Sequence, residues 1–187
     1  MGEHGQQFAA FLTYAALGPV EGYTTQEWRT AIAALPQKGL QESAQALVQA
    51  LEGAADQREE YWKNRILPFW RDVWPKSRDR VTQNISASLA RLCIAADSEF
   101  PAAVTEVLDW LHPIDHPYDV ISRLHKTGLC GRFPVPALLL LGRVVTDPTW
   151  VASELGQCLD LIVQANSELA CDSRYQRLRE YVRKRGG

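Results

Sequence analysis

The sequence predicts an all-α protein made of stacked antiparallel helix pairs, an irregular α-solenoid of the HEAT-like kind. Apolar residues recur at intervals of three and four along most of the chain and alternate almost nowhere, which indicates helices rather than strands. Capping residues, prolines and glycines separate these stretches at short intervals. A weak repeat of about 30 residues also runs through the second half. An irregular helical bundle is the alternative architecture.

The first half of the chain predicts helices with clear starts and stops. One helix is expected to open at Thr24, because this threonine can cap a free amide and Glu27 can reach back to the cap, and to stop at Pro36. Pro68 is expected to kink the long segment from Asp56 to Trp74, because proline lacks an amide donor and clashes with the preceding turn. The other apolar stripes of this half comprise Phe8, Phe11, Leu12 and Ala15; Leu40, Ala44, Leu47, Val48 and Leu51; and Ile85, Leu89, Leu92 and Ala96.

Prolines and glycines become denser in the second half. A stripe at 104–111 is followed by a helix that should open at His116-Pro117 and close at Gly128 in a left-handed conformation. The segment from Pro136 to Val145 is apolar all round and is therefore predicted to be the most buried helix. Asp147-Pro148 and Asp172 are expected to open the last two helices.

Two dipeptide signatures suggest an internal repeat. Phe100-Pro101 is echoed by Phe133-Pro134 after 33 residues, and His116-Pro117 by Asp147-Pro148 after 31 residues. Each unit would be a helix, a proline turn and a second helix, and would hide its apolar face by stacking on its neighbour. We therefore expect residues 1–187 to form a single helical domain, with possible sub-units at 1–60 and 61–187.

Composition describes an ordinary globular chain, with 46% hydrophobic residues, 22% charged residues and a net charge of −2. The longest apolar run is far short of the roughly 20 residues that cross a bilayer, and the first residues do not form a signal sequence. A cytoplasmic location without membrane contact is therefore expected. The four cysteines lack the close pairing of zinc or redox motifs, and are interpreted as reduced packing residues: Cys93, Cys130, Cys158 and Cys171.

The charges are grouped in blocks of alternating sign. Residues 1–60 carry a net charge of −5, residues 61–80 of +4, residues 81–171 of −5 and residues 172–187 of +4. The two basic blocks are the candidates for contact with an anionic partner.

The segment 61–80 is unusual because three of the six tryptophans lie there among cations. One interpretation is an aromatic and arginine surface that binds a protein; another is a stacking platform for single-stranded nucleic acid. The third is structural: the aromatic residues form the inner face of a kinked helix and the cations its solvated outside. The predicted interaction residues are Trp62, Arg65, Trp70, Arg71, Trp74, Lys76 and Arg78.

Two histidines and two carboxylates fall within residues 112–119: His112, Asp115, His116 and Asp119. These residue types suit zinc binding or acid–base chemistry, but two prolines force an extended link there and favour a turn between helices. The sequence also lacks a phosphate loop, a dinucleotide fingerprint, a nucleophile elbow and a zinc-protease motif. We therefore expect no catalytic residues, no cofactor and no metal.

Several stretches resemble the carboxy-terminal helical region of large bacterial proteins, some of them similar to sirtuin-headed proteins proposed to act in phage defence. The resemblance spans most of residues 5–185 and is carried by YWKNRILPFW, VWPKSRD, SLARLCIAA, FPAAV with VLDWL, SRLHKTGLCGRFP, and ELGQCLD with RYQRLREY. It implies that this chain is a helical tail or fragment without the catalytic head, and it carries no active residue onto these positions. It also implies a scaffold or recognition role beside an effector.

The predicted function is therefore a non-catalytic helical scaffold or protein-interaction module, within a larger bacterial protein of the defence type. Its partner would be another protein or an adjoining domain of a longer chain. The alternative is a nucleic-acid-binding helical domain that uses residues 61–80 and the basic C-terminus, with binding that weakens steeply as salt increases.

Overall fold

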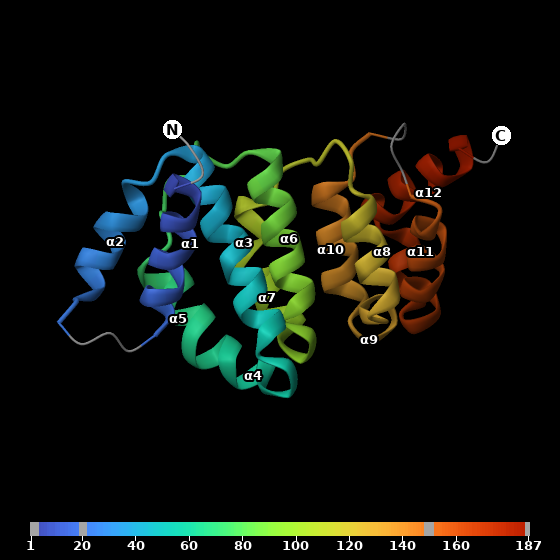
Figure 1. Ribbon diagram of the computed structural model, residues 1–187. Coiled ribbons are helices and arrows are strands. Elements are labelled where there is room, and N and C mark those ends of the chain that lie inside the picture. The colour runs from blue at the N-terminus through green and yellow to red at the C-terminus, as the bar shows by residue number, and fades with distance from the viewer. Residues whose placement is uncertain (1–3, 19–21, 148–151, 186–187) are drawn as a thin grey trace.

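The structure, a computed structural model, describes residues 4–18, 22–147 and 152–185. Within these ranges the regular structure is helical and contains no strand, so the all-α prediction is confirmed. The helices lie side by side in an elongated stack that has α1 and α2 at one end and α12 at the other (Figure 1).

The stack has two rows of helices. In the front row each helix contacts the next, in the order α1 (His4–Leu17), α3 (Gln37–Gly53), α6 (Gln83–Ala95), α8 (Tyr118–Lys126) and α11 (Glu154–Ala165). The back row comprises α2 (Thr25–Ala33), α4 (Arg58–Tyr61) with α5 (Leu67–Asp72), α7 (Phe100–Val107), α9 (Leu129–Arg132) with α10 (Pro134–Val144), and α12 (Ser173–Arg185). Each front helix and the back helix that follows it in the chain form one pair, and the pairs lie one after another along the stack. The predicted architecture of stacked helix pairs is therefore confirmed.

Contacts between neighbouring pairs reveal the repeat. Trp70 Nε1 donates to the carbonyl oxygen of Glu106 at 3.2 Å, 36 residues away. The hydroxyl of Tyr181 donates to the carbonyl oxygen of Thr146 at 3.0 Å, 35 residues away. The rings of Phe100 and Phe133 lie 6.2 Å apart at the starts of α7 and α10, so the Phe-Pro echo does mark equivalent positions. The second predicted echo, at Asp147-Pro148, lies partly outside the described residues.

The turns after three front helices share one backbone conformation. Ala55, Asp97 and Gly128 follow α3, α6 and α8, and have φ angles of 46°, 48° and 68°. This left-handed region is easy for glycine but strained for residues with a Cβ atom. The predicted left-handed closure at Gly128 is confirmed. The two preceding pairs also have a residue with positive φ at this position, but there it is not a glycine, so the sequence does not indicate it.

The predicted start of α2 is confirmed. The Thr24 side chain accepts from the Glu27 amide at 3.2 Å, and the Glu27 carboxylate accepts from the Thr24 amide at 2.7 Å. The hydrogen bonds that the Thr24 amide and the Thr24 hydroxyl donate to the Glu27 carboxylate lower the pKa of Glu27 below its usual value. At the other end of the stack, Asp172 Oδ1 accepts from the Arg174 amide at 2.8 Å and begins α12, as predicted.

The segment around Pro68 is broken rather than straight, as predicted. A π-helical turn at Trp62–Ile66 separates α4 from α5, and the Leu67 amide donates to the Trp62 carbonyl oxygen. The wider turn accommodates the carbonyl groups that the proline ring would otherwise strike. The change in direction between α4 and α5 is visible in Figure 1.

The prediction that 136–145 is the most buried helix is wrong. In α10, five of eleven residues are buried, and Val135 is 44% exposed, whereas nine of thirteen are buried in α6. α6 packs between α3 and α8 and also contacts α7 and α10, whereas α10 leaves Val135 and Arg143 exposed to solvent. The small residues of α6, such as Ser86 and Ala90, let its neighbours approach closely.

The cysteines are all free thiols. Cys93, Cys130 and Cys158 are buried packing residues as predicted, but the prediction is wrong for Cys171, which is exposed near the start of α12. Contact with Cys158 and burial both raise the pKa of Cys130, so its thiol stays protonated at neutral pH.

Candidate functional site

The predicted aromatic surface at 61–80 lies inside the protein. Trp62, Trp70 and Trp74 are 0%, 3% and 3% exposed. Trp70 stacks on Trp74 with ring centroids 5.2 Å apart. It also forms a T-shaped pair with Trp110, with ring centroids 5.1 Å apart. These side chains form the core between α5 and the end of α7, which agrees with the interpretation as the inner face of a kinked helix. They are not exposed anchors for a partner.

Two of the four predicted cations in this segment contact the next helix pair. Arg71 pairs with the Glu106 carboxylate, and Arg78 pairs with Asp109 at 3.0 Å while its guanidinium lies 4.7 Å from the Trp110 ring centroid. Lys76 donates to the Arg71 carbonyl oxygen. Arg65 is exposed and makes no ion pair with the described residues. A role for any of these four cations in binding remains a prediction.

The basic C-terminal block behaves in the same way. Arg179 pairs with Asp160 of α11 at 2.8 Å, and Arg177 donates to the Gly142 carbonyl oxygen of α10 at 2.6 Å. Both basic blocks therefore contact acidic residues of other helices: the first reaches Glu106 and Asp109 in the next pair, and the second reaches Asp160 of α11 in its own pair.

The cluster at 112–119 forms a pinned linker. The amide of His112 donates to Ser86 Oγ at 2.9 Å, and the same hydroxyl donates to the His112 carbonyl oxygen at 2.8 Å. The amide of Ile114 donates to the Val144 carbonyl oxygen at 3.0 Å. The link is thereby tied to both α6 and α10. In the described ranges, no group of three or more histidine, cysteine or acidic side chains is arranged to hold a metal ion.

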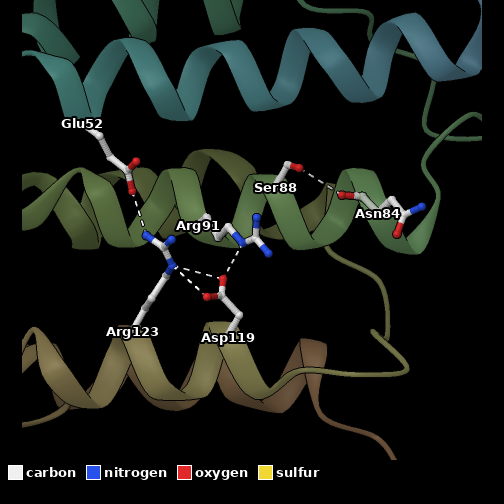
Figure 2. Close-up of polar contacts among 6 residues, drawn as sticks. All are labelled: Glu52, Asn84, Ser88, Arg91, Asp119 and Arg123. Atoms are coloured by element: carbon white, nitrogen blue, oxygen red, sulfur yellow. Dashed lines mark hydrogen bonds and ion pairs between the residues drawn. The ribbon is translucent and has the colours of Figure 1, made fainter.

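An ion-pair network joins three front-row helices, and Figure 2 shows its members. Arg123 of α8 reaches Glu52 of α3 at 2.8 Å and Asp119 at 3.1 Å, and Arg91 of α6 reaches the other oxygen of Asp119 at 2.6 Å. The hydrogen bond that Arg123 donates to Asp119, together with the negative charges of Asp119 and Glu52, raises the pKa of Arg123. No local sequence signal marks this network, because its residues come from separate helices.

A cavity of about 290 Å³ lies beside the network. Its lining includes four basic side chains: Arg58, Arg91, Arg123 and Lys126. Three front helices, α3, α6 and α8, end close to this cavity. Each helix C-terminus carries a partial negative charge that attracts cations. Together with Glu52 and Asp119, these helix ends explain the cluster without a ligand.

Exposed large hydrophobic side chains gather at the N-terminal end of the stack. Phe8, Phe11 and Tyr14 of α1 are 57%, 67% and 42% exposed, and Tyr23 before α2 is 59% exposed. We call Phe8, Phe11 and Tyr14 the N-terminal aromatic face. Tyr14 also donates from its hydroxyl to Gln49 of α3 at 2.9 Å, so this ring marks the edge of the face nearest α3.

The apolar stripe predicted along α1 is only partly buried: Leu12 packs against the core, whereas Phe8 and Phe11 are exposed. The side chains of α1 that are buried are Ala9, Thr13 and Leu17. Thr13 Oγ1 donates to Ser43 Oγ of α3 at 2.7 Å, and such small partners let α1 and α3 approach closely. This buried polar contact cannot be recognised from the spacing of apolar residues alone.

Comparison with known proteins finds one relative to report. The chain is 29% identical to the uncharacterized protein y4cA of Sinorhizobium fredii (strain NBRC 101917 / NGR234) over 131 residues. The match covers 68% of this chain and 11% of that protein, so the chain spans about a tenth of the relative's length. No protein family and no solved structure matches the chain.

The chain is thus a helical domain similar to part of a larger bacterial protein. Within the described residues, every helix is too short or too polar to cross a bilayer.

Proposed function

We propose that this chain is a non-catalytic helical scaffold that contacts other protein surfaces, as one module of a larger, cytoplasmic bacterial protein of the defence type. The observation that carries the proposal is the gathering of exposed rings at one end of the stack. Six large hydrophobic side chains are exposed in the described residues, and four of them lie within residues 8–23. Exposed apolar surface that gathers in one place is typical of a contact site.

The energetic argument favours contact with protein. Fully covering one phenylalanine side chain contributes about 1.5–3 kcal/mol, so two such rings contribute several kcal/mol to association. In solenoids, a helix pair at an end of the stack needs a polar outer face to remain soluble unless another unit covers it. The exposed rings of α1 supply such an uncovered face.

Nucleic acid is less well supported as the partner. Of the basic segment's cations, Arg71, Arg78 and Lys76 are engaged with groups of the protein itself. Binding phosphates would have to compete with these contacts, which favours the protein alternative.

The test is a panel of photo-crosslinking amino acids placed at exposed positions in the intact protein in its own bacterium. Suitable positions are Phe11, Tyr23, Arg65, Thr105 and Gln176. We expect a covalent adduct with a protein at one or more of them. Adducts with nucleic acid, or no macromolecular adduct at any position, would contradict the proposal.

A further inference from the structure

The outer side of α1 has the character of a helix inside a stack, although α1 lies at the end of the described front row. Its inner side, at Ala9, Thr13 and Leu17, packs on α3. Its outer side presents Phe8, Phe11 and Ala15, which are spaced by three and four residues as in a helix-packing stripe.

The chemistry of this outer side also points to an apolar occupant. The sequence of α1, HGQQFAAFLTYAAL, contains no lysine, arginine, aspartate or glutamate. A partner would gain no ion pair from it, and a charged surface would lose solvation there without compensation. The fitting surface is therefore the apolar side of another helix.

The front row shows how such a helix would lie. The ends of α3, α6 and α8 meet at one cavity, so these helices run parallel to one another. A further helix parallel to α1 would continue the row by the same side-by-side packing that joins α1 to α3.

The relative supplies a source for this helix. About nine-tenths of y4cA lies outside the matched region. We propose that the N-terminal aromatic face binds an amphipathic helix from the part of the larger protein that lies outside this match, packed parallel to α1 over Phe8 and Phe11. The inference rests on the proposed function and adds the partner's source, its chemistry and its orientation.

The experiment places the photo-crosslinking residue at Phe11 of the intact protein in its bacterium and identifies the attached peptide by mass spectrometry. The attached peptide is expected to have helical apolar periodicity and to come from a sequence similar to the unmatched part of y4cA. Phe8→Ser should reduce the adduct at least 10-fold. Phe8 is exposed, so this change should leave the helical circular dichroism signal unchanged.

Gln176 of α12 is the matched control, because it is exposed at the opposite end of the stack. Equal adducts at Phe11 and Gln176 would overturn the inference, as would an adduct at Phe11 with a second copy of residues 1–187 or with an unrelated protein. No adduct at Phe11 would also overturn it. Protein adducts at Arg65 or Thr105 would then leave the proposed function standing, so the two failures are distinguishable.

Discussion

The two ends of the stack differ in how they meet solvent. At the C-terminal end, α12 buries Leu178, packs Tyr175 and Tyr181 against the core and turns cations outward. At the N-terminal end, α1 turns Phe8 and Phe11 outward instead. A solenoid is closed by a helix with a polar outer side, so α12 closes this stack while α1 leaves it open.

The largest expected effect lies between the two ends. Trp62→Ala should lower the free energy of unfolding by about 3–5 kcal/mol, because it empties a fully buried site in the π turn. Urea unfolding followed by circular dichroism measures the loss. Arg65→Ala, in the same turn but exposed, is the control and should change stability by less than about 0.5 kcal/mol. Similar values for the two variants would contradict the buried position of Trp62.

The closing role of α12 is tested next. Leu178→Ala should cost about 3 kcal/mol, because Leu178 is the side chain of α12 that is fully buried among the described residues. Binding of a hydrophobic dye should rise as the helix detaches and uncovers α10 and α11. An unchanged dye signal together with unchanged stability would show that α12 does not close the stack.

A smaller effect is expected at the start of α12. The Arg174 side chain and the Arg174 amide hold the pKa of Asp172 at about 2, against its ordinary 3.8. A carboxyl whose pKa is lowered by folding adds stability above the unfolded-state pKa, and that stability is lost as the pH falls from about 4 toward 2. Asp172→Asn should cost about 1 kcal/mol at pH 7, because asparagine can still cap the helix but loses the ion pair, which lies at the surface.

Most of this cost should be lost by pH 2, where about half of the wild-type carboxyl is neutral. Urea unfolding of both proteins from pH 7 to pH 2 measures the difference. A cost that stays constant over this range would mean that the ion pair contributes nothing.

The smallest effect on stability is expected at the open end. The double change Phe8→Ser and Phe11→Ser should alter the free energy of unfolding by less than about 0.5 kcal/mol, because both rings already face solvent. Dye binding should fall, in contrast to its rise in Leu178→Ala. A loss of 2 kcal/mol or more would show that the rings are buried and would remove the difference between the two ends.

Local signals predicted much of the fold. Thr24 with Glu27, Pro68, Gly128 and Asp172 act through bonds or clashes with residues only a few positions away, so their effects can be read from the sequence. The Phe-Pro echo succeeded because it marks the starts of α7 and α10 in neighbouring pairs.

Burial on particular helix faces could not be predicted in the same way, because it depends on which side of an element the neighbouring helices pack against. Apolar spacing grouped Phe8 and Phe11 with Leu12, whereas in the structure Thr13 is buried against Ser43 of α3 and both phenylalanines are exposed. The charge blocks were visible in the sequence, but their pairing joins residues such as Arg71 and Glu106 that are 35 positions apart.

The left-handed turn shared by Ala55, Asp97 and Gly128 affects more than local geometry. The turn joins the front and back helix of one pair, so each of these pairs has a similar internal connection and forms one step of the stack. A gene that gains or loses one whole step would therefore change the distance between the two ends of the molecule without altering how either end is built.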